Sequence, residues 1–596
     1  MSIRTLAELV AQVAEREKPD LLLHKVEGSY RAISTSQFMT GVLRLAHALA
    51  GLGVGRGDRV ALMAENGPHW PTVDFATIAR GAALVPIYPT LLPEQAAYIV
   101  RDSGSKVLFV QGRERLEGLL AVRAQMPALE LVVWTDGDAP GQGFATLEDL
   151  LERGRDADPA AFDAGLRETR PEELATLIYT SGTTGDPKGV MLSHANLVSN
   201  VVTGTQVLQL SSDYTALSFL PLSHSLERTV DYCYFYCGCT IAYAESIQTV
   251  AQNLGEVRPH LFVAVPRVYE KVQSRVMETA AAGSPLKQRI FAWALGIGRQ
   301  ALPYRLREQA VPGLLGVQLA LADRLVFAKI RERLGGRFVF AISGGAPLPR
   351  EVAEFFWGAG IRLFEGYGLT ETSPVISVNA FAAVKMGSVG RPIPGVEVRI
   401  AEDGEILARG PNIMQGYFGK PEATAEVIDE QGWFHTGDIG HLDEEGFLAI
   451  TDRKKELIVN AYGKNIAPAP IENALKASRF ISQAVVIGDR RQYLVALLVP
   501  DFEALNPWAA KQGLPAAPAA LLATPQVREL VQREVETVNS QLARYEQIRS
   551  WELLPAEFTL ETGELTPTQK VKRRVIHEKY GEIIERLYRE GDGGNG

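Results

Sequence analysis

The chain has 596 residues, of which 46% are hydrophobic and 22% charged, a composition that excludes a disordered, collagen-like or coiled-coil protein. The 61 Lys and Arg residues against 70 Asp and Glu residues give a formal net charge of −9, which argues against a nucleic-acid-binding protein. The 3 cysteines are too few for a disulfide scaffold and fit a reducing compartment.

The N-terminal residues and the apolar runs predict neither a signal peptide nor a membrane span. Charges at Glu8, Glu15 and Arg16 interrupt the apolar core that a signal peptide needs. The longest uncharged apolar runs, 232–244 and 309–322, are shorter than the roughly 18 residues of a membrane helix. We expect a cytoplasmic protein, with peripheral contact to the inner face of the membrane left open.

The first 170 residues alternate between helical and strand patterns. Residues 36–53 carry apolar side chains at helical spacing, and a short apolar run at 59–66 predicts a buried strand. A second helix is predicted over 69–81 and a second strand over 82–87. Strands separated by helices of this length indicate parallel βαβ units, covered by helices on both faces.

Residues 179–190 form the strongest chemical signal in the chain. They follow a strand-like run at 174–178 and combine three glycines, four hydroxyl side chains and Lys188. Glycines let backbone N–H groups turn toward a ligand, while the hydroxyls add hydrogen-bond donors and the lysine adds positive charge. This composition favours binding of a polyphosphate. It is not a Walker A loop, because Pro187 precedes the lysine and no Gly-Lys-Ser/Thr ending follows. A plain surface turn does not need this composition.

Residues 275–337 form a basic segment inside an acidic chain. Between Lys287 and Arg337 there are ten Lys and Arg residues against three acidic ones, a local charge of +7. Apolar residues interleave with these charges, which predicts an amphipathic helical insert. Two interpretations are equally open: the insert contacts an anionic membrane, or it packs as a helical subdomain with a solvated face.

The character of the sequence changes near 452–455. Two strand patterns, 485–488 and 493–500, flank a polar turn and predict a hairpin. Thr524 and Pro525 are a good N-cap and first residue for a following helix, whose apolar face runs from Val527 to Leu542. A hairpin, a helix and a basic tail after a long α/β lobe predict a separate small α+β domain.

The 179–190 loop resembles the phosphate-binding signature of the adenylate-forming superfamily of AMP-binding enzymes, and further motifs follow in that family's order. Residues 344–348 resemble its adenine-pocket turn, 366–372 its next motif, and 433–438 the strand that holds ribose. Over essentially the whole chain, the closest resemblance is to bacterial long-chain fatty acid–CoA ligases, which are acyl-CoA synthetases.

The resemblance implies an α/β fold in which a large N-terminal lobe of parallel and mixed sheets is flanked by helices. That AMP-binding domain is expected over 1–451, with the helical insert at about 275–337. A hinge is expected at 452–455, with Asp452 and Lys455 as pivot residues. A small mobile α+β domain is expected over 456–596.

The resemblance also implies residues for ATP, AMP and Mg²⁺. In the family the aromatic ring at Tyr367 stacks on adenine, the residue at Thr370 contacts the α-phosphate, and the one at Asp438 accepts the ribose hydroxyls. Glu371 is the expected Mg²⁺ ligand. The implied ATP/AMP-binding set is Thr180, Ser181, Gly182, Thr183, Thr184, Gly185, Lys188, Gly345, Ala346, Pro347, Gly366, Tyr367, Gly368, Thr370, Asp438 and Arg453.

The implied catalytic residues are Lys570, Thr184, Lys188 and His224. Lys570 lies in 566–573, where the family has a lysine that reaches the reacting carboxylate and phosphate, although Gln569 replaces the usual glycine. A carboxylate that attacks ATP is an anion approaching a polyanion, with a repulsion of roughly 4 kcal/mol at 4 Å and an effective dielectric near 20. Cationic groups must offset that charge.

Residues 221–228 resemble the motif that lines the acid site of long-chain acyl-CoA synthetases. His224 is then near the carboxylate, although a satisfied core histidine is the alternative interpretation. Some relatives have an aromatic gate four residues later, but this chain has Arg228, so the gate is not implied. The run 232–239 is apolar enough to wall an acyl tunnel, and its cysteine spacing favours buried packing over zinc.

The acceptor of the acyl group is left open by the sequence. In the family the small domain rotates and builds a channel for a pantetheine thiol, which places Gly463 and Lys464 on the CoA side. CoA, ATP and a fatty acid are the expected small molecules, with no nucleic acid. The alternatives are a ligase that loads a carrier protein or another acceptor, or one that uses a different carboxylic acid. A non-catalytic relative is disfavoured because Lys188, Glu371 and Asp438 are all retained.

Overall fold

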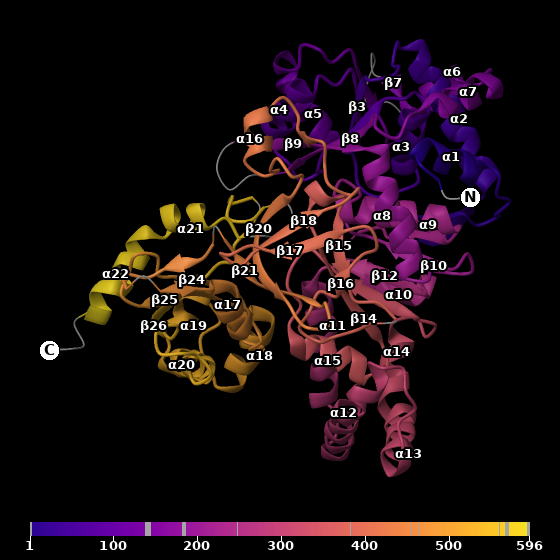
Figure 1. The fold of residues 1–596 in the computed structure, drawn as a ribbon. Helices are drawn as coiled ribbons and strands as arrows, with labels where there is room; N and C mark the ends of the chain where they lie inside the picture. Colours follow the sequence, from indigo (N-terminus) through magenta and orange to yellow (C-terminus); the bar gives the residue numbers. More distant parts are fainter. Residues whose placement is uncertain are drawn as a thin grey trace. The chain divides into compact units, whose positions relative to one another are not determined.

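The computed structural model describes residues 3–137, 145–180, 186–246, 248–381, 383–454, 456–462, 464–559, 561–566 and 571–592 (Figure 1). The chain divides into two compact units. The first comprises Met1–Arg399, Leu407–His435 and Leu442–Leu448, and the second comprises Ile400–Ile406, Thr436–His441 and Ala449–Gly596. The boundary at 451 and the hinge at 452–455 stay predictions.

The first unit contains a sheet of nine strands in the order β16-β15-β14-β13-β12-β10-β11-β1-β2. Neighbouring strands from β14 to β1 are parallel, and the strands at both ends are antiparallel. The strands are β1 (Leu22–Val26), β2 (Ser29–Ile33), β10 (Thr215–Ser218), β11 (Thr240–Tyr243), β12 (Leu261–Ala264), β13 (Phe340–Ser343), β14 (Arg362–Gly368), β15 (Val375–Val378) and β16 (Arg391–Pro392).

A second sheet of eight strands has the order β19-β9-β8-β4-β3-β5-β6-β7. The run from β8 to β7 is parallel, and β9 and β19 join it antiparallel. The strands are β3 (Arg59–Met63), β4 (Ala83–Pro86), β5 (Val107–Val110), β6 (Leu131–Trp134), β7 (Ala145–Thr146), β8 (Leu174–Thr180), β9 (Lys188–Ser193) and β19 (Gly416–Tyr417).

Helices cover both faces of these sheets, so the predicted α/β class is confirmed. Every residue of β4, β5 and β10 to β13 is buried, as expected for parallel strands with helices on both sides. The helices are α1 (Leu6–Ala14), α2 (Thr35–Gly51), α3 (His69–Ala79), α4 (Pro93–Ser103), α5 (Arg113–Ala121), α6 (Leu147–Arg153), α7 (Pro159–Glu168), α8 (His194–Val207), α9 (Ser225–Cys237), α10 (Val250–Val257), α15 (Arg350–Gly358) and α16 (Pro421–Ala425).

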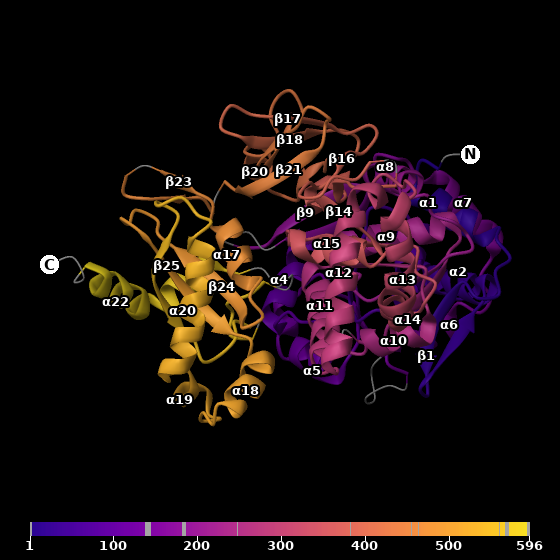
Figure 2. The same ribbon diagram turned by 90° about the horizontal axis from the view of Figure 1, so that it is seen from below.

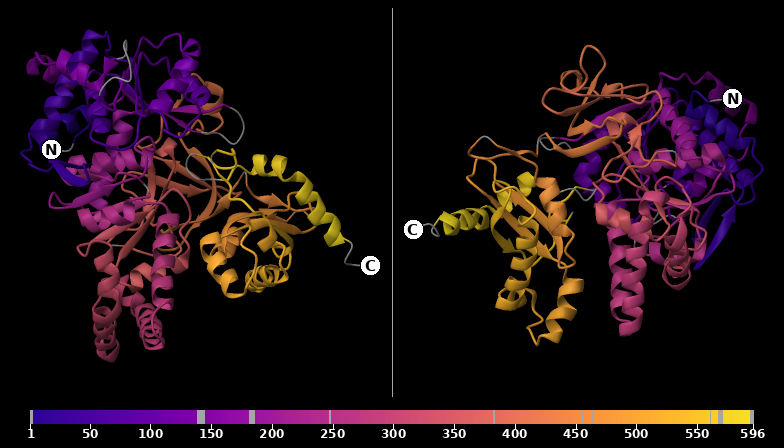
Figure 3. Two further views of the ribbon diagram at one scale, coloured as in Figure 1. Left: turned by 180° about the vertical axis from the view of Figure 1, so that it is seen from behind. Right: turned by 60° about the horizontal axis from the view of Figure 1, so that its bottom comes forward.

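The basic segment is helical over most of its length. It contains the end of α11 (Pro266–Ala281), then α12 (Pro285–Arg305), α13 (Gly313–Ala322), a π-helical turn η2 (Asp323–Phe327) and α14 (Ala328–Arg333). Helices α12 and α13 extend side by side away from the sheets of the first unit (Figures 1 and 3). Among the described residues, we find no helix with the length and apolar character needed to cross a membrane.

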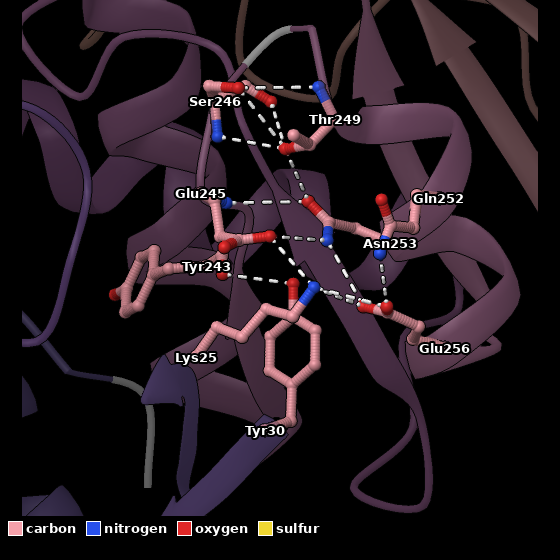
Figure 4. Close-up of polar contacts among 9 residues, drawn as sticks. All are labelled: Lys25, Tyr30, Tyr243, Glu245, Ser246, Thr249, Gln252, Asn253 and Glu256. Carbon is pink, nitrogen blue, oxygen red and sulfur yellow. Dashed lines mark hydrogen bonds and ion pairs between the residues drawn. The ribbon is translucent and has the colours of Figure 1, made fainter. Parts of the chain in front are cut away.

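A polar cluster attaches the edge of the nine-stranded sheet to a helix (Figure 4). Lys25 of β1 has a side chain that is only 5% exposed, and its Nζ lies 2.8 Å from Glu245 Oε2 and 2.9 Å from Glu256 Oε2. Glu245 follows β11 and Glu256 belongs to α10. Hydrogen bonds to these two carboxylates raise the pKa of Lys25, so the charge of Lys25 is well compensated. The cluster therefore has a structural role, joining β1 to α10.

The second unit has its own three-stranded sheet and its own core. Strand β24 (Ile481–Ile487) pairs antiparallel with β25 (Leu494–Pro500), which confirms the predicted hairpin, and β26 (Ile548–Leu553) joins β25 in parallel. Figure 2 shows α17 and α20 lying against this sheet. The helices are α17 (Pro468–Lys476), α18 (Phe502–Lys511), α19 (Pro518–Leu522), α20 (Pro525–Asn539), α21 (Arg573–Lys579) and α22 (Gly581–Asp592).

The predicted helix of this unit is confirmed as α20. Thr524 is its N-cap residue in extended conformation, and the next residue is Pro525 at the first helical position. The Thr524 hydroxyl donates back to the Leu521 carbonyl and makes no capping hydrogen bond. Valines at 527, 531, 535 and 538 are buried, so the apolar face predicted from the sequence does pack on the core.

A buried ion pair joins elements of both large sheets in the first unit. Arg228 of α9 is 2% exposed and donates to Asp74 of α3 through Nη2 (2.6 Å) and Nε (3.0 Å). Its Nη1 donates to Thr176 Oγ1 of β8 at 2.7 Å, and the Tyr232 hydroxyl donates to Asp74 Oδ2 at 2.6 Å. Burial disfavours the guanidinium charge, but Asp74 and Tyr232 together outweigh this effect and raise the pKa of Arg228.

Removal of one partner of this pair is expected to destabilise the protein strongly. In Arg228→Met the Asp74 carboxylate stays buried without its counter-ion, so we expect the free energy of unfolding to fall by about 3–5 kcal/mol. The double variant Asp74→Leu/Arg228→Met should recover most of that loss, because no charge is left behind. Urea unfolding measures both, and a loss below about 1 kcal/mol in the single variant contradicts the role of the pair.

Candidate active site

Three of the sequence motifs follow parallel strands of the nine-stranded sheet. Residues 221–228 come after β10, 344–348 come directly after β13, and 366–372 begin inside β14. Parallel strands end at the same edge of a sheet, so the topology brings the three motifs to one edge. That carboxyl edge is where α/β folds bind their ligands.

The phosphate-loop segment connects β8 and β9 of the other sheet. Thr180 and Lys188 are cross-strand partners, so the strands place both at the ends of the connection. The predicted residues Ser181, Gly182, Thr183, Thr184 and Gly185 lie outside the described residues. The loop's far end is tied to the fold, because the Tyr98 hydroxyl and Lys420 Nζ both donate to the carbonyl of Pro187.

A tyrosine connects Lys188 to the predicted metal ligand. Tyr417 of β19 pairs with β9 beside the lysine, and Lys188 Nζ lies 4.8 Å from the centroid of its ring. The Tyr417 hydroxyl donates to Glu371 Oε1 at 3.0 Å. Burial and the Glu371 carboxylate raise the pKa of Tyr417, so the hydroxyl remains a donor. Tyr417 was not predicted from the sequence, because its role arises from a strand pairing between distant segments.

Glu371 is held by the short helix η3 (Thr370–Thr372). Its carbonyl accepts a hydrogen bond from the Met414 amide at 2.8 Å, which joins this motif to the segment that leads into β19. The Thr370 hydroxyl lies 3.3 Å from the Ser225 hydroxyl at the start of α9. The structure therefore links Lys188 to Glu371 through Tyr417, and Thr370 lies beside Glu371 in η3. That these residues share a ligand stays a prediction.

His224 is the N-cap of α9. Its Nδ1 accepts the Leu226 amide at 3.1 Å, so the neutral ring carries its proton on Nε2. The ring is half-buried and lies edge-on to Tyr88, with centroids 6.5 Å apart. Because the cap fixes the ring beside Ser225, His224 is next to the network that holds Thr370. Its contact with an acyl carboxylate stays a prediction.

The turn predicted for adenine is attached to β14 by Glu365. Glu365 Oε1 accepts the Leu348 amide at 3.1 Å, and burial raises the pKa of this carboxyl to about 7. Within the turn, which includes Ala346 and Pro347, Gly345 has φ +80°, a conformation that favours glycine. Glu365 was not predicted, although an acid directly before Gly366 at a strand end is a visible signal.

Gly366, Tyr367 and Gly368 form the end of β14. Tyr367 is half-buried and pairs with Ser377 of β15, with a register shift immediately after it. A Cβ at Gly368 would lie 1.7 Å from the Pro374 carbonyl oxygen, so a side chain cannot be accommodated there. The glycine therefore allows the strand to turn into η3, which carries Thr370 and Glu371.

In the second unit the two residues predicted for ribose contact each other. They lie on the neighbouring strands β20 (Phe434–Leu442) and β21 (Leu448–Arg453) of a four-stranded sheet that also contains β17 (Glu397–Ile400) and β18 (Glu405–Arg409). Arg453 Nε donates to Asp438 Oδ1 at 3.0 Å, and Asp438 is 4% exposed. The carboxylate is therefore charge-compensated and fixed in orientation.

The predicted hinge and CoA-side residues are partly described. Asp452 is buried, its Oδ2 has no hydrogen-bond partner among the described residues, and burial raises the pKa of its carboxyl to about 6. The backbone of Lys464 is held by Asn460, whose Oδ1 accepts the Lys464 amide at 2.9 Å. Lys455 and Gly463 lie outside the described residues.

Lys570 also lies outside the described residues, but the two sides of its loop are described. Leu565 and Val571, which precede and follow this segment, form an antiparallel bridge. Arg573 then donates to Glu472 of α17 at 2.7 Å and to the Val486 carbonyl at 3.0 Å. The basic end of the 566–573 motif thus serves as an anchor for the loop.

Comparison with protein families and known proteins assigns the chain. The family described as AMP-binding enzyme matches residues 10–418, and the AMP-binding enzyme C-terminal domain matches residues 455–592. The chain is 39% identical to the long-chain-fatty-acid–CoA ligase FadD15 of Mycobacterium tuberculosis, over 96% of this chain and 95% of that protein. It is 35% identical to the peroxisomal long chain acyl-CoA synthetase 6 of Arabidopsis thaliana, over 94% of this chain and 82% of that protein.

Solved structures share the fold. The adenylation domain of a carboxylate reductase from Mycobacterium chelonae superposes with a TM-score of 0.78 at 24% identity, over 98% of this chain and 91% of that one. A fatty acyl CoA synthetase from Mycobacterium tuberculosis gives a TM-score of 0.62 at 23% identity, over 97% and 99%. These matches confirm the predicted fold class. The chain belongs to the AMP-binding enzyme family.

Proposed function

We propose that the chain is an AMP-forming ligase that joins a long-chain fatty acid to CoA. The observation that carries the proposal is the contact series from Lys188 through Tyr417 to Glu371, which sets a cation and a carboxylate at the carboxyl edge of the sheets. The 39% identity to a long-chain-fatty-acid–CoA ligase over nearly the full length supports the choice of acid and acceptor.

In the first step a fatty acid carboxylate oxygen attacks the α-phosphorus of ATP. The new O–P bond forms the acyl-adenylate, the bond to the β-phosphate oxygen breaks, and pyrophosphate leaves. Lys188 and the backbone amides of the loop are proposed to bind the pyrophosphate portion, and Thr370 the α-phosphate. Fixed donors at these positions stabilise the negative charge that gathers on the transferring group.

Mg²⁺ fits the residues at Glu371 as a metal shared with the nucleotide. No group of three or more His, Cys, Asp or Glu side chains in the described ranges is arranged to hold a metal ion alone. One carboxylate together with phosphate oxygens is a typical Mg²⁺ arrangement. Bound there, the metal supplies positive charge to the phosphates. The Tyr417 hydroxyl would hold Glu371 Oε1 and so orient the carboxylate.

In the second step the CoA thiol loses its proton to solvent and its sulfur attacks the acyl carbon. The C–S bond forms, the acyl C–O bond to AMP breaks, and AMP leaves with one oxygen of the original carboxylate. Asp438 and Arg453 are proposed to hold the ribose in both steps, and Lys570 to contact the carboxylate and α-phosphate in the first. Lys464 is proposed to face the thiol acceptor. Asp452 is proposed as a pivot, because few groups compensate its carboxyl.

A cytoplasmic location and peripheral contact with an anionic membrane complete the proposal. A long-chain acid has a large apolar surface and partitions from water into bilayers. An enzyme that contacts the bilayer surface therefore gains direct access to the acid dissolved in it. A soluble carrier for the acid is the alternative source.

The proposal is tested by a panel of saturated acids from short to long chains. The purified full chain should convert ATP to AMP and pyrophosphate only with acid present, and kcat/KM should rise towards long chains. Free CoA should be consumed in equal amount to AMP. AMP formation without consumption of free CoA contradicts CoA as acceptor, and a preference for short or aromatic acids contradicts the substrate class.

The role of Lys570 is tested by its alanine variant. We expect Lys570→Ala to lower acid-dependent exchange of pyrophosphate into ATP by ~10²–10³-fold, the effect of one lost charge-stabilising group. Thioester formation from added acyl-adenylate should change far less. Lys572→Ala is the matched control, because it removes a lysine two positions away in the same sequence motif. Equal exchange rates in the two variants contradict the assignment.

Tyr417 and Glu371 are tested together through their dependence on Mg²⁺. Glu371→Gln should lower adenylation by roughly 10²-fold and raise the Mg²⁺ concentration for half-maximal rate, because a charged oxygen ligand is lost. Tyr417→Phe removes a hydrogen bond to a charged group and should lower the rate by roughly 10-fold, with a smaller shift in the same direction. A Tyr417→Phe variant with the wild-type Mg²⁺ dependence shows that Tyr417 does not orient Glu371.

A further inference from the structure

Helix α13 presents apolar side chains to solvent along one side. Leu314, Val317 and Leu321 are 73%, 68% and 50% exposed, and their spacing of three and four residues places them on one face. We call these three residues the α13 face. Gly313–Ala322 contains no charged residue. Large apolar side chains exposed together on one face are unusual on a protein surface and mark a contact site.

The exposure of this face does not result from loose packing of the helix. On its other side, Leu315 and Leu319 pack against the main core. At the C-terminal end of the helix and just after it, Ala322 and Phe327 are fully buried. Asp323 accepts two hydrogen bonds from Arg331, at 2.7 and 2.8 Å. The base of α13 is therefore fixed while its outer face remains in water.

The segments before and after α13 are basic. Arg307, Arg324 and Lys329 are exposed and form no ion pair within the described ranges. Two of the three acids between Lys287 and Arg337 are compensated, because Glu308 pairs with Arg362 at 3.1 Å and Asp323 pairs with Arg331. The third, Glu332, is exposed and forms no ion pair within the described ranges, so the local balance stays positive. An uncharged apolar helix with cations before and after it complements a surface that has an anionic outer layer over an apolar interior.

We infer that the α13 face inserts into the headgroup region of an anionic phospholipid bilayer, with Arg307, Arg324 and Lys329 at the lipid phosphates. This inference deepens the proposed function, since it names the surface that contacts the membrane. A bilayer is favoured over a second protein for a physical reason. Three side chains on one helix offer far less than the roughly 1,200 Å² of a stable protein interface, whereas lipid tails accept isolated leucines without shape complementarity.

The apolar contribution is tested by flotation with vesicles, without any substrate. The full chain should float with phosphatidylglycerol–phosphatidylcholine vesicles and much less with pure phosphatidylcholine. The triple variant Leu314→Ser/Val317→Ser/Leu321→Ser should bind at least about 10-fold more weakly. Leu92→Ser is the matched control, because Leu92 is also exposed (62%) but lies outside the insert. Wild-type binding by the triple variant overturns the inference.

The basic contribution is tested by Arg324→Ser/Lys329→Ser, which leaves the apolar face intact. Each charge removed should weaken binding roughly fivefold, and added salt should weaken the wild type more than this variant. Equal flotation of the wild type on neutral and anionic vesicles overturns the inference. So does a wild-type dimer that becomes a monomer in the triple variant, because the face is then occupied by a second copy.

The two proposals fail separately in this design. Ligase activity is assayed in parallel on a water-soluble medium-chain acid in the absence of vesicles. The triple variant should keep that activity and its unfolding temperature, since its substitutions lie on an exposed face away from both sheets. Vesicle binding by a chain with no ligase activity sinks the enzymatic proposal alone, and activity without vesicle binding sinks this inference alone.

Discussion

The first unit depends on one buried charge, the guanidinium of Arg228. It is desolvated almost completely, a costly state that persists only because Asp74 and Tyr232 compensate it and Thr176 accepts a further hydrogen bond. These partners come from α3, α9 and β8. Because the Arg228 charge is stable only while these contacts are kept, it holds the start of α9 against β8, the strand that leads into the phosphate loop. Packing alone tolerates small sliding between layers, but a bidentate ion pair does not.

That geometry determines where the residues proposed for the site meet. The start of α9 supplies His224 and Ser225, and Ser225 lies against Thr370. Strand β9 supplies Lys188, and β19 beside it supplies Tyr417, which reaches Glu371. An anion that attacks a polyanion needs positive charge and donors fixed in advance, and the proposed site draws these groups from the edges of both sheets. The buried Arg228 thus supports the position of the proposed site as well as the fold.

Local patterns predicted the elements well, whereas contacts between distant segments could not be predicted. Alternating periodicity gave α2, β3, α3 and β4, and turn chemistry gave the β24–β25 hairpin and α20. Strand β26 was missed because its six residues pair in parallel with residues about 55 positions earlier in the chain. Tyr417 and Glu365 were missed because their partners lie far away in sequence or in another turn. Arg228 was noted as a departure at a gate position, and the sequence held no sign of Asp74 as its partner.

In the proposed reaction a carboxylate oxygen attacks the α-phosphorus of ATP at this site. Its most direct test uses a long-chain fatty acid labelled with ¹⁸O in both carboxylate positions, with ATP, CoA and the purified chain. The claim predicts that each AMP produced carries one ¹⁸O atom and that pyrophosphate carries none. Label in inorganic phosphate or pyrophosphate, or unlabelled AMP alongside thioester, would contradict an acyl-adenylate intermediate and with it the assignment of Lys188, Glu371 and Thr370.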